Sequence, residues 1–182
     1  MKTERISWDA ASGMLLGLAI GDALGASLEF HSSREPENYL REYKSGGLHN
    51  LPAGCWTDDT SMALAIAEGL LERNGEFDPH LIMENFVSWM TDGEFSSTGT
   101  CFDIGMTCQM ALGKYRKDKS NPYCGPTDPY SAGNGALMRT APVIIAARDE
   151  REAIENALLQ TRLTHGCTEC LQYSEAFARE LW

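Results

Sequence analysis

The sequence has little positive charge and no long uninterrupted apolar run. Its 15 Lys and Arg residues against 26 Asp and Glu residues give a formal net charge of -11. Such an excess of negative charge repels phosphate backbones and anionic lipids, so we expect no nucleic-acid partner and no membrane partner. Asp9 and Asp22 interrupt the apolar N-terminal segment, which falls short of the roughly 20 residues needed to span a bilayer. These absences predict a cytoplasmic protein.

Paired cysteine motifs are also scarce. Of the six cysteines, Cys167 and Cys170 form a C-x-x-C pair, and no second pair stands at zinc-finger spacing. We interpret the six as reduced thiols that behave as small buried side chains. A redox or zinc role is the alternative.

No alternating strand pattern of useful length is present, and apolar residues recur at helical spacing instead. With 182 residues, 43% of them hydrophobic, the chain can bury a core of its own. We therefore predict a single all-α domain over residues 1–182. The expected helices cover about 8–30, 57–74, 79–89, 101–116, 135–148, 150–161 and 167–181.

Glycines occur at every fourth position of the first expected helix, at Gly13, Gly17, Gly21 and Gly25. Each costs roughly 1 kcal/mol of helix propensity relative to alanine. A row of them on one face predicts that another backbone packs very close there. A flexible apolar linker is the alternative.

The segment Thr57-Asp58-Asp59-Thr60 stands at the expected N-terminus of an apolar helix, where free N–H groups and the helix dipole favour anions. Its carboxylates and hydroxyls are hard oxygen ligands of the kind that magnesium prefers. Consecutive helical residues point about 100° apart, so the two aspartates could serve two ions. Helix capping alone is the alternative.

A loop of small residues, Ser131-Ala132-Gly133-Asn134-Gly135, precedes an expected helix. Such a loop exposes backbone N–H groups that can hold a phosphate. No Gly-Lys-Ser/Thr follows it, so the pattern is weaker than a Walker loop, and a tight turn explains it nearly as well. The loop 96–100, with Asp103 one turn later, is similar.

Two single residues, taken alone, are explained by ordinary structural roles. Glu29 follows the first expected helix, where a solvent-facing acid is common. His165, within Thr164-His165-Gly166, starts the last helix, where a structural role is commoner than a catalytic one.

Taken together and in this order, these segments resemble the ADP-ribosylglycohydrolase family. The resemblance implies an all-α orthogonal helical fold and a two-magnesium site, with Mn²⁺ as a possible substitute. It also implies hydrolysis of the bond between ADP-ribose and a protein side chain, often arginine, with an ADP-ribosylated protein or ADP-ribose as the ligand. The matching stretches are GLAIGDALGASLEF (17–30), WTDDTSMALAIAEGL (56–70), STGTCFDIG (97–105), GNGALMRTAPV (133–143) and LTHG (163–166).

The resemblance also assigns roles to residues. It makes Thr57, Asp58 and Asp59 metal ligands, and it gives catalytic roles to Glu29, Asp59 and Asp103. The residues that it implies for substrate binding, at the diphosphate and the distal ribose, are Gly99, Ser131, Gly133, Asn134, Gly135 and His165.

The sequence departs from the family pattern in two ways. Family members complete the metal site with a late Asp-x-Asp-Thr-type segment, and no such segment occurs up to Trp182. We therefore expect a domain that lacks its C-terminal helices. Three explanations are open: a fragment of a longer protein, a split enzyme whose missing aspartates come from a second chain, or a non-catalytic homologue with an ADP-ribose-binding or structural role. Met106 also replaces a common Asn, which would alter how the leaving group is held.

Overall fold

The computed structural model describes residues 5–182, so the first four residues of the predicted domain lie outside the described part. Residues 5–182 form seven α-helices and no β-strand, which confirms the all-α prediction. The α-helices are α1 (Trp8–Gly25), α2 (Asp58–Glu72), α3 (Pro79–Asp92), α4 (Met106–Lys117), α5 (Ala141–Ala146), α6 (Glu150–Thr164) and α7 (Thr168–Leu181). Short 3-10 turns occur at η1 (Ala26–Leu28), η2 (Pro36–Asn38), η3 (Pro129–Ser131) and η4 (Asn134–Ala136).

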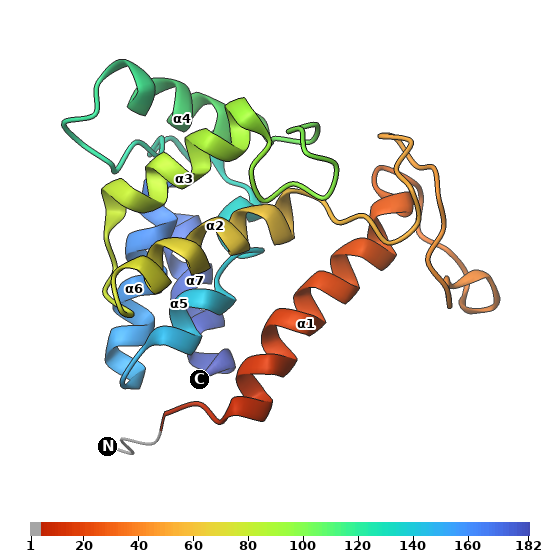
Figure 1. Cartoon of the computed structure of the whole chain (residues 1–182), viewed down its shortest axis with the longest axis horizontal. Coiled ribbons are helices and arrows are strands. Elements are labelled where there is room, and N and C mark those ends of the chain that lie inside the picture. Colours follow the sequence, from red (N-terminus) through yellow and green to blue (C-terminus); the bar gives the residue numbers. More distant parts are fainter. Residues whose placement is uncertain (1–4) are drawn as a thin grey trace.

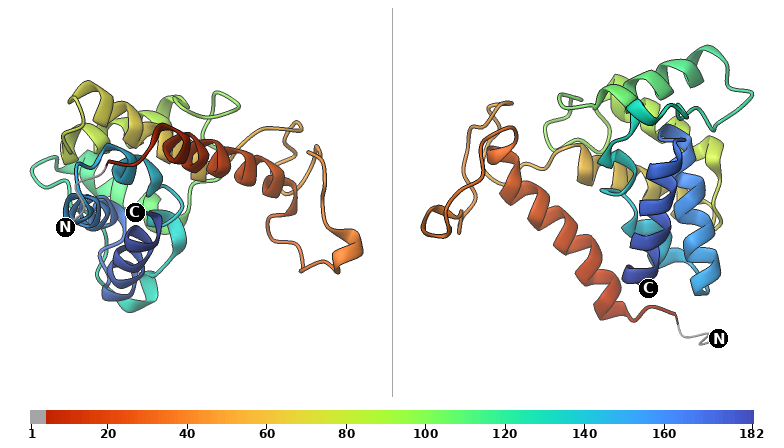
Figure 2. Two further views of the ribbon diagram at one scale, coloured as in Figure 1. Left: turned by 90° about the horizontal axis from the view of Figure 1, so that it is seen from below. Right: turned by 180° about the vertical axis from the view of Figure 1, so that it is seen from behind.

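Helices α2 to α7 form the body of the molecule, and α1 lies along its edge (Figures 1 and 2). Within the body, α2 packs against α3 and α5, while α6 packs against α5 and α7. Helix α1 contacts α2 and α5. The long segment 31–55 extends beyond the C-terminal end of α1, away from α6 and α7 (Figure 2).

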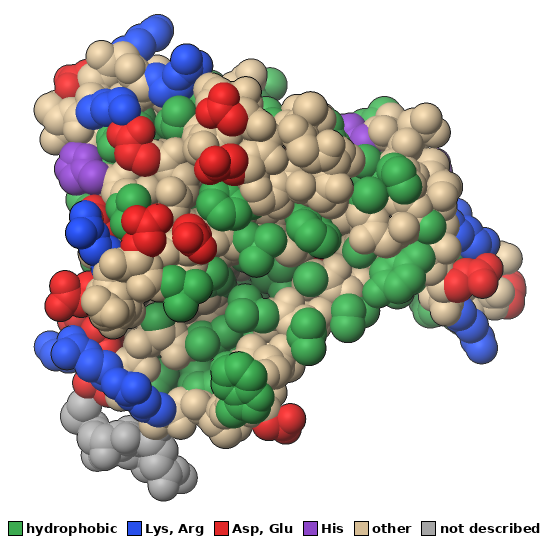
Figure 3. Space-filling model, viewed as in Figure 1, with side chains coloured by type: hydrophobic (Ala, Val, Ile, Leu, Met, Phe, Trp, Pro, Cys, Tyr) green, Lys and Arg blue, Asp and Glu red, His purple; other side chains and the backbone are tan. Residues whose placement is uncertain are grey.

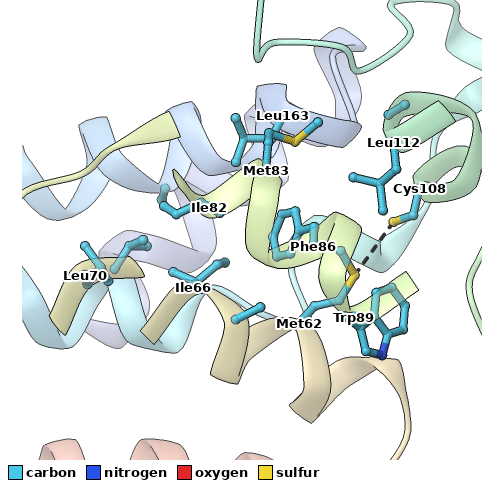
Figure 4. Close-up of a cluster of buried hydrophobic side chains, with 14 of the residues drawn as sticks. Met62, Ile66, Leu70, Ile82, Met83, Phe86, Trp89, Cys108, Leu112 and Leu163 are labelled. Carbon is cyan, nitrogen blue, oxygen red and sulfur yellow. Dashed lines mark hydrogen bonds between the residues drawn. The ribbon is translucent and has the colours of Figure 1, made fainter. Parts of the chain in front are cut away.

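The core lies between α2, α3, α4 and α6. Figure 4 shows Met62 and Ile66 of α2 facing Phe86 of α3, with Cys108 of α4 beside them. Their apolar positions recur at helical spacing, so each helix presents one continuous face to its neighbours. All six cysteines are free thiols, as predicted, and the buried ones are Cys108, Cys124, Cys167 and Cys170.

Two of the expected helices have different limits in the structure. Helix α4 begins at Met106 and not near 101, because residues 101–105 stay extended and carry Asp103 to the N-terminus of α2. The expected helix 135–148 is divided into η4 and the short α5. Pro142 explains the division, since a residue without an N–H is tolerated in the first turn of a helix but not in its interior.

The prediction about the glycine row is wrong for the described structure. Nothing lies within 4 Å of the position that a Cβ atom would take on Gly13, Gly17, Gly21 or Gly25. In α1 itself, Ala23 is the buried residue. Figure 3 shows hydrophobic side chains along α1 and on the part of the body that it faces. A large apolar surface therefore remains open around α1.

By length and composition alone, the segment Trp8–Leu28 could cross a membrane. The interruption of its apolar run by Asp9 and Asp22 had predicted a shorter stretch. In the structure, the Asp22 side chain is hydrogen-bonded to the start of α2.

Asp22 fastens α1 to the start of α2. Its carboxylate accepts the backbone N–H groups of Thr57 and Thr60, at 3.0 and 3.1 Å. It also accepts the hydroxyl of Thr57 at 2.7 Å and that of Thr60 at 2.6 Å. The side chain thus acts as an N-cap for α2 from another helix, in the place where a helix ordinarily uses its own capping residue.

We predict that Asp22→Asn lowers the free energy of unfolding by about 1–3 kcal/mol, because the amide offers one acceptor oxygen where four donors converge. The matched control is Asp9→Asn, an exposed acid in the first turn of the same helix, which should cost less than about 1 kcal/mol. Urea denaturation measures both. Equal losses would show that Asp22 is not an anchor.

Candidate active site

A cavity of about 230 Å³ lies at the N-terminus of α2. It brings together eight of the residues that the sequence singles out, although they are spread over more than 130 positions of the chain. One group is acidic, and the other comprises the small-residue loop and His165. His165 does not start the last helix, as the sequence had indicated, but caps the C-terminal end of α6, and α7 begins at Thr168. These eight are Glu29, Asp58, Asp59, Asp103, Gly133, Asn134, Gly135 and His165.

The capping of α2 is supplied by other parts of the chain. Thr57 occupies the N-cap position but makes no side-chain capping bond. Asp22 binds the N–H groups of Thr57 and Thr60, and Asp103 accepts the N–H of Asp58 at 2.6 Å. Helix capping therefore does not account for Asp58 and Asp59, which stand in the first turn and line the cavity.

The carboxylates of the cavity raise one another's pKa values. Burial raises the pKa of Asp58 to about 8, with further contributions from Asp103, Asp59 and Glu29. Burial also raises the pKa of Asp103 to about 6, against the lowering effect of its bond to the Asp58 N–H. The pKa of Asp59 is raised by burial and then by Asp22. Closely spaced acids in partial burial resist ionising together.

Glu29 meets His49, a residue of the long segment 31–55. His49 Nε2 lies 3.5 Å from Glu29 Oε2, and the histidine ring packs against Phe102 at a centroid distance of 5.2 Å. Among residues 5–182, no hydrogen-bond partner reaches Oε2, although this atom is buried. Burial raises the pKa of Glu29, and the His49 charge opposes this shift. Nothing in the sequence pattern pointed to His49.

The opposite wall is formed by the loop 133–135 and by His165. The imidazole packs directly on the two glycines. A Cβ atom on Gly135 would lie 2.8 Å from His165 Cε1, whereas one on Gly133 would lie 3.5 Å from Nε2. Gly135 is therefore required for the ring to occupy its place.

Three predicted site residues do not line the cavity. Thr57 is buried, and its hydroxyl donates to Asp22 at 2.7 Å, while Asp59 Oδ2 lies 3.3 Å from the same oxygen. Gly99 sits in an exposed turn with φ of 74°. The Ser131 carbonyl accepts from the Thr107 hydroxyl at 3.3 Å. Met106, which the family resemblance places where an Asn is expected, does line the cavity and is 77% exposed.

The donor chemistry of the acidic wall suits a hard cation. Asp58, Asp59, Asp103 and Glu29 offer oxygen atoms, burial raises the pKa values of all four, and one Glu29 oxygen lacks a hydrogen-bond partner among the described residues. Within residues 5–182, however, no three His, Cys, Asp or Glu side chains are grouped closely enough to hold a metal ion by themselves. The described residues thus fit one part of a metal shell.

Comparison with known proteins shows the family to which the chain belongs. The sequence model of the ADP-ribosylglycohydrolase family matches residues 2–180. The chain is 41% identical to the ADP-ribosylarginine hydrolase Tri1 of Serratia proteamaculans, over 92% of this chain and 45% of that protein. It is 36% identical to the ADP-ribosyl-[dinitrogen reductase] glycohydrolase of Rhodospirillum rubrum, over 86% of this chain and 51% of the relative.

A solved structure of an ADP-ribosylglycohydrolase-related protein complex superposes with a TM-score of 0.76 and 40% identity, over 93% of this chain and 54% of that one. The chain thus spans about half the length of the relatives that it matches. Because the family model covers nearly all of the sequence and the fold agrees, the chain belongs to the ADP-ribosylglycohydrolase family.

Proposed function

We propose that this chain carries one part of the active site of a magnesium-dependent hydrolase that removes ADP-ribose from a modified protein side chain, most plainly arginine. One observation carries the proposal. The cavity sets an acidic wall with raised pKa values against a wall of glycines and histidine. The names of the relatives support the linkage, since one acts on ADP-ribosylarginine and another on ADP-ribosyl-dinitrogen reductase.

We propose that Asp58 and Asp59 hold magnesium, with Thr57 as a further ligand. Bound there, magnesium would grip ribose hydroxyls and stabilise charge at the sugar. Thr57 already places its hydroxyl 3.3 Å from Asp59 Oδ2.

Asp103 and Glu29 are the proposed proton-handling groups. A carboxyl with a pKa of about 6 can change protonation state near neutral pH, so Asp103 suits general acid–base work. The same carboxylate could accept hydrogen bonds from the departing guanidinium. Glu29 Oε2, buried and without a hydrogen-bond partner among the described residues, could orient or activate a water molecule at the sugar.

The other wall would bind the nucleotide part of the ligand. Gly133, Asn134 and Gly135 line the cavity with little side-chain bulk, which lets a diphosphate approach the backbone N–H groups. His165 adds a ring nitrogen beside them. Ser131 and Gly99 lie outside the cavity lining and would contact the more distant parts of the ligand.

We further propose that a second polypeptide chain completes the metal site. The acidic wall alone supplies fewer than three grouped ligands within residues 5–182. A second cavity of about 480 Å³ adjoins the first and shares Asp59, Asn134 and Met138 with it. Its far side is the exposed face of α7, where Tyr173 and Phe177 are 59% and 41% exposed. An apolar helix seated there would bring its own side chains to Asp59.

We predict that the chain hydrolyses ADP-ribosyl-arginine with magnesium when it is mixed with the part of the Serratia relative that lies outside the matched 169 residues. Asp58→Ala and Asp59→Ala should each lower this rate by more than about 100-fold, since losing even a second-shell partner of a metal costs about 10–100-fold. Release of ADP-ribose measures the rate.

The control for that experiment is Glu72→Ala, an exposed acid at the other end of α2, which should leave the rate unchanged. Absence of turnover in every mixture, while ADP-ribose still binds, would contradict an enzyme and favour a non-catalytic ADP-ribose-binding homologue.

We predict that Gly135→Ala weakens ADP-ribose binding by about tenfold or more, because its Cβ would lie 2.8 Å from the His165 ring and displace it. Gly113→Ala is the matched control, since Gly113 lies on α4 outside the cavity and no atom of the described structure lies within 4 Å of its Cβ position. Isothermal calorimetry compares the two. Similar affinities for both variants would argue against a ligand at this wall.

The raised pKa of Asp58 predicts a pH effect on stability in the absence of magnesium. Folded Asp58 keeps its proton up to about pH 8, while the unfolded chain releases it near pH 3.8. Folding therefore takes up a proton in this range, and the free energy of unfolding falls as the pH rises. We expect a steeper fall between pH 6.5 and 8 for the wild type than for Asp58→Asn. Parallel curves from urea denaturation would refute the shift.

A further inference from the structure

A buried arginine lies behind the cavity wall without a carboxylate partner. Arg139 has 0% of its surface exposed, and its guanidinium stacks on the Phe86 ring at 4.5 Å. Among the residues described, it forms no salt bridge. It donates instead to Gln160, through Nε to the side-chain oxygen at 2.9 Å and through Nη2 to the backbone oxygen at 3.0 Å. Nη2 also donates to Thr164 Oγ1 at 2.7 Å.

These hydrogen bonds have a fixed direction. A guanidinium has donors and no acceptor, so Thr164 Oγ1 must accept from Arg139 and still has a proton of its own to donate. Thr164 Oγ1 lies 2.8 Å from His165 Nδ1. The Cys108 thiol also faces this hydroxyl, but burial keeps it protonated and a neutral thiol is a weak acceptor. Nδ1 is therefore the acceptor for the Thr164 proton.

The proton of the neutral imidazole must then sit on the other nitrogen, Nε2. That nitrogen is on the cavity side, 3.2 Å and 3.5 Å from the Cβ positions of Gly135 and Gly133. No acceptor for Nε2 occurs within the described part of the chain. Burial and the Arg139 charge lower the pKa of His165 to about 4, which keeps the ring neutral near pH 7.

We infer that Arg139 and Thr164 are positioning residues, which hold His165 as the Nε2–H tautomer and aim that N–H at an acceptor oxygen of the bound ligand. The identity of the ligand, a diphosphate or ribose oxygen of ADP-ribose, rests on the proposed function. The tautomer itself does not, because it follows from hydrogen bonds within the protein. Neither Arg139 nor Thr164 lines the cavity, so both act through His165.

The test is long-range ¹H–¹⁵N NMR of histidine-labelled protein without ligand, with the His165 signals assigned by their loss in His165→Gln. We expect the Nε2–H tautomer in the wild type and in Thr164→Ser, which keeps the hydroxyl. Thr164→Val removes the proton donor and should shift the ring toward the Nδ1–H form. Thr161→Val is the matched control, since its buried hydroxyl lies on the same helix, donates to Ala157 or Ser174, accepts from Gln160 Nε2 and makes no hydrogen bond to His165 within the described structure.

Two results would overturn the inference. The first is an Nδ1–H tautomer in the wild type, a measurement that does not depend on any variant folding. The second is an unchanged tautomer in Thr164→Val. Binding is then measured by calorimetry with ADP-ribose, where Thr164→Val should weaken affinity about tenfold and Thr161→Val should not. Equal affinities of these two variants would also count against it. The expected tautomer in a wild type that fails to bind ADP-ribose would overturn the proposed function and leave the positioning role intact.

Discussion

The first turn of α2 has backbone N–H groups without helical partners, and the shape of the cavity depends on how they are satisfied. Asp22 reaches them from α1, and Asp103 reaches them from the segment before α4. Because both caps come from other parts of the chain, the side chains of Asp58 and Asp59 are not needed for capping and remain available to the cavity. The same bonds join three distant parts of the chain, so the fold and the acidic wall depend on one set of contacts.

Charge is distributed unevenly across the cavity. Four carboxylates stand on one side, and within residues 5–182 His49 is the base that approaches them closely, through Glu29. The positive charge of Arg139 lies behind the other wall, fully buried and bound by neutral groups. The ligand proposed for this site carries a cation on its sugar side and an anionic diphosphate on the other, which matches this polarity.

Much of this arrangement could be predicted from the sequence, because helical periodicity and local motifs are properties of neighbouring residues. Asp58, Asp59, Gly133 and Gly135 were found in that way, and the cavity contains them. The sequence did not predict the role of Asp22. A cap supplied by a different helix lies far away in the sequence, so no local motif marks it. The glycine row of α1 misled for a related reason: it predicts a close neighbour, and the described residues provide none. Arg139 lies within the expected helix 135–148, where no local pattern distinguishes a fully buried arginine from an exposed one.

We propose that the acidic wall gives up protons in exchange for a divalent cation. The most direct test is the number of protons released when magnesium binds, obtained by calorimetry near neutral pH in two buffers with different ionisation enthalpies. Since the pKa of Asp58 is raised to about 8, the site holds a proton at this pH that the ion must displace. We expect a net release of protons from the wild type and a smaller release from Asp58→Asn. Magnesium binding with no proton release would contradict this proposal.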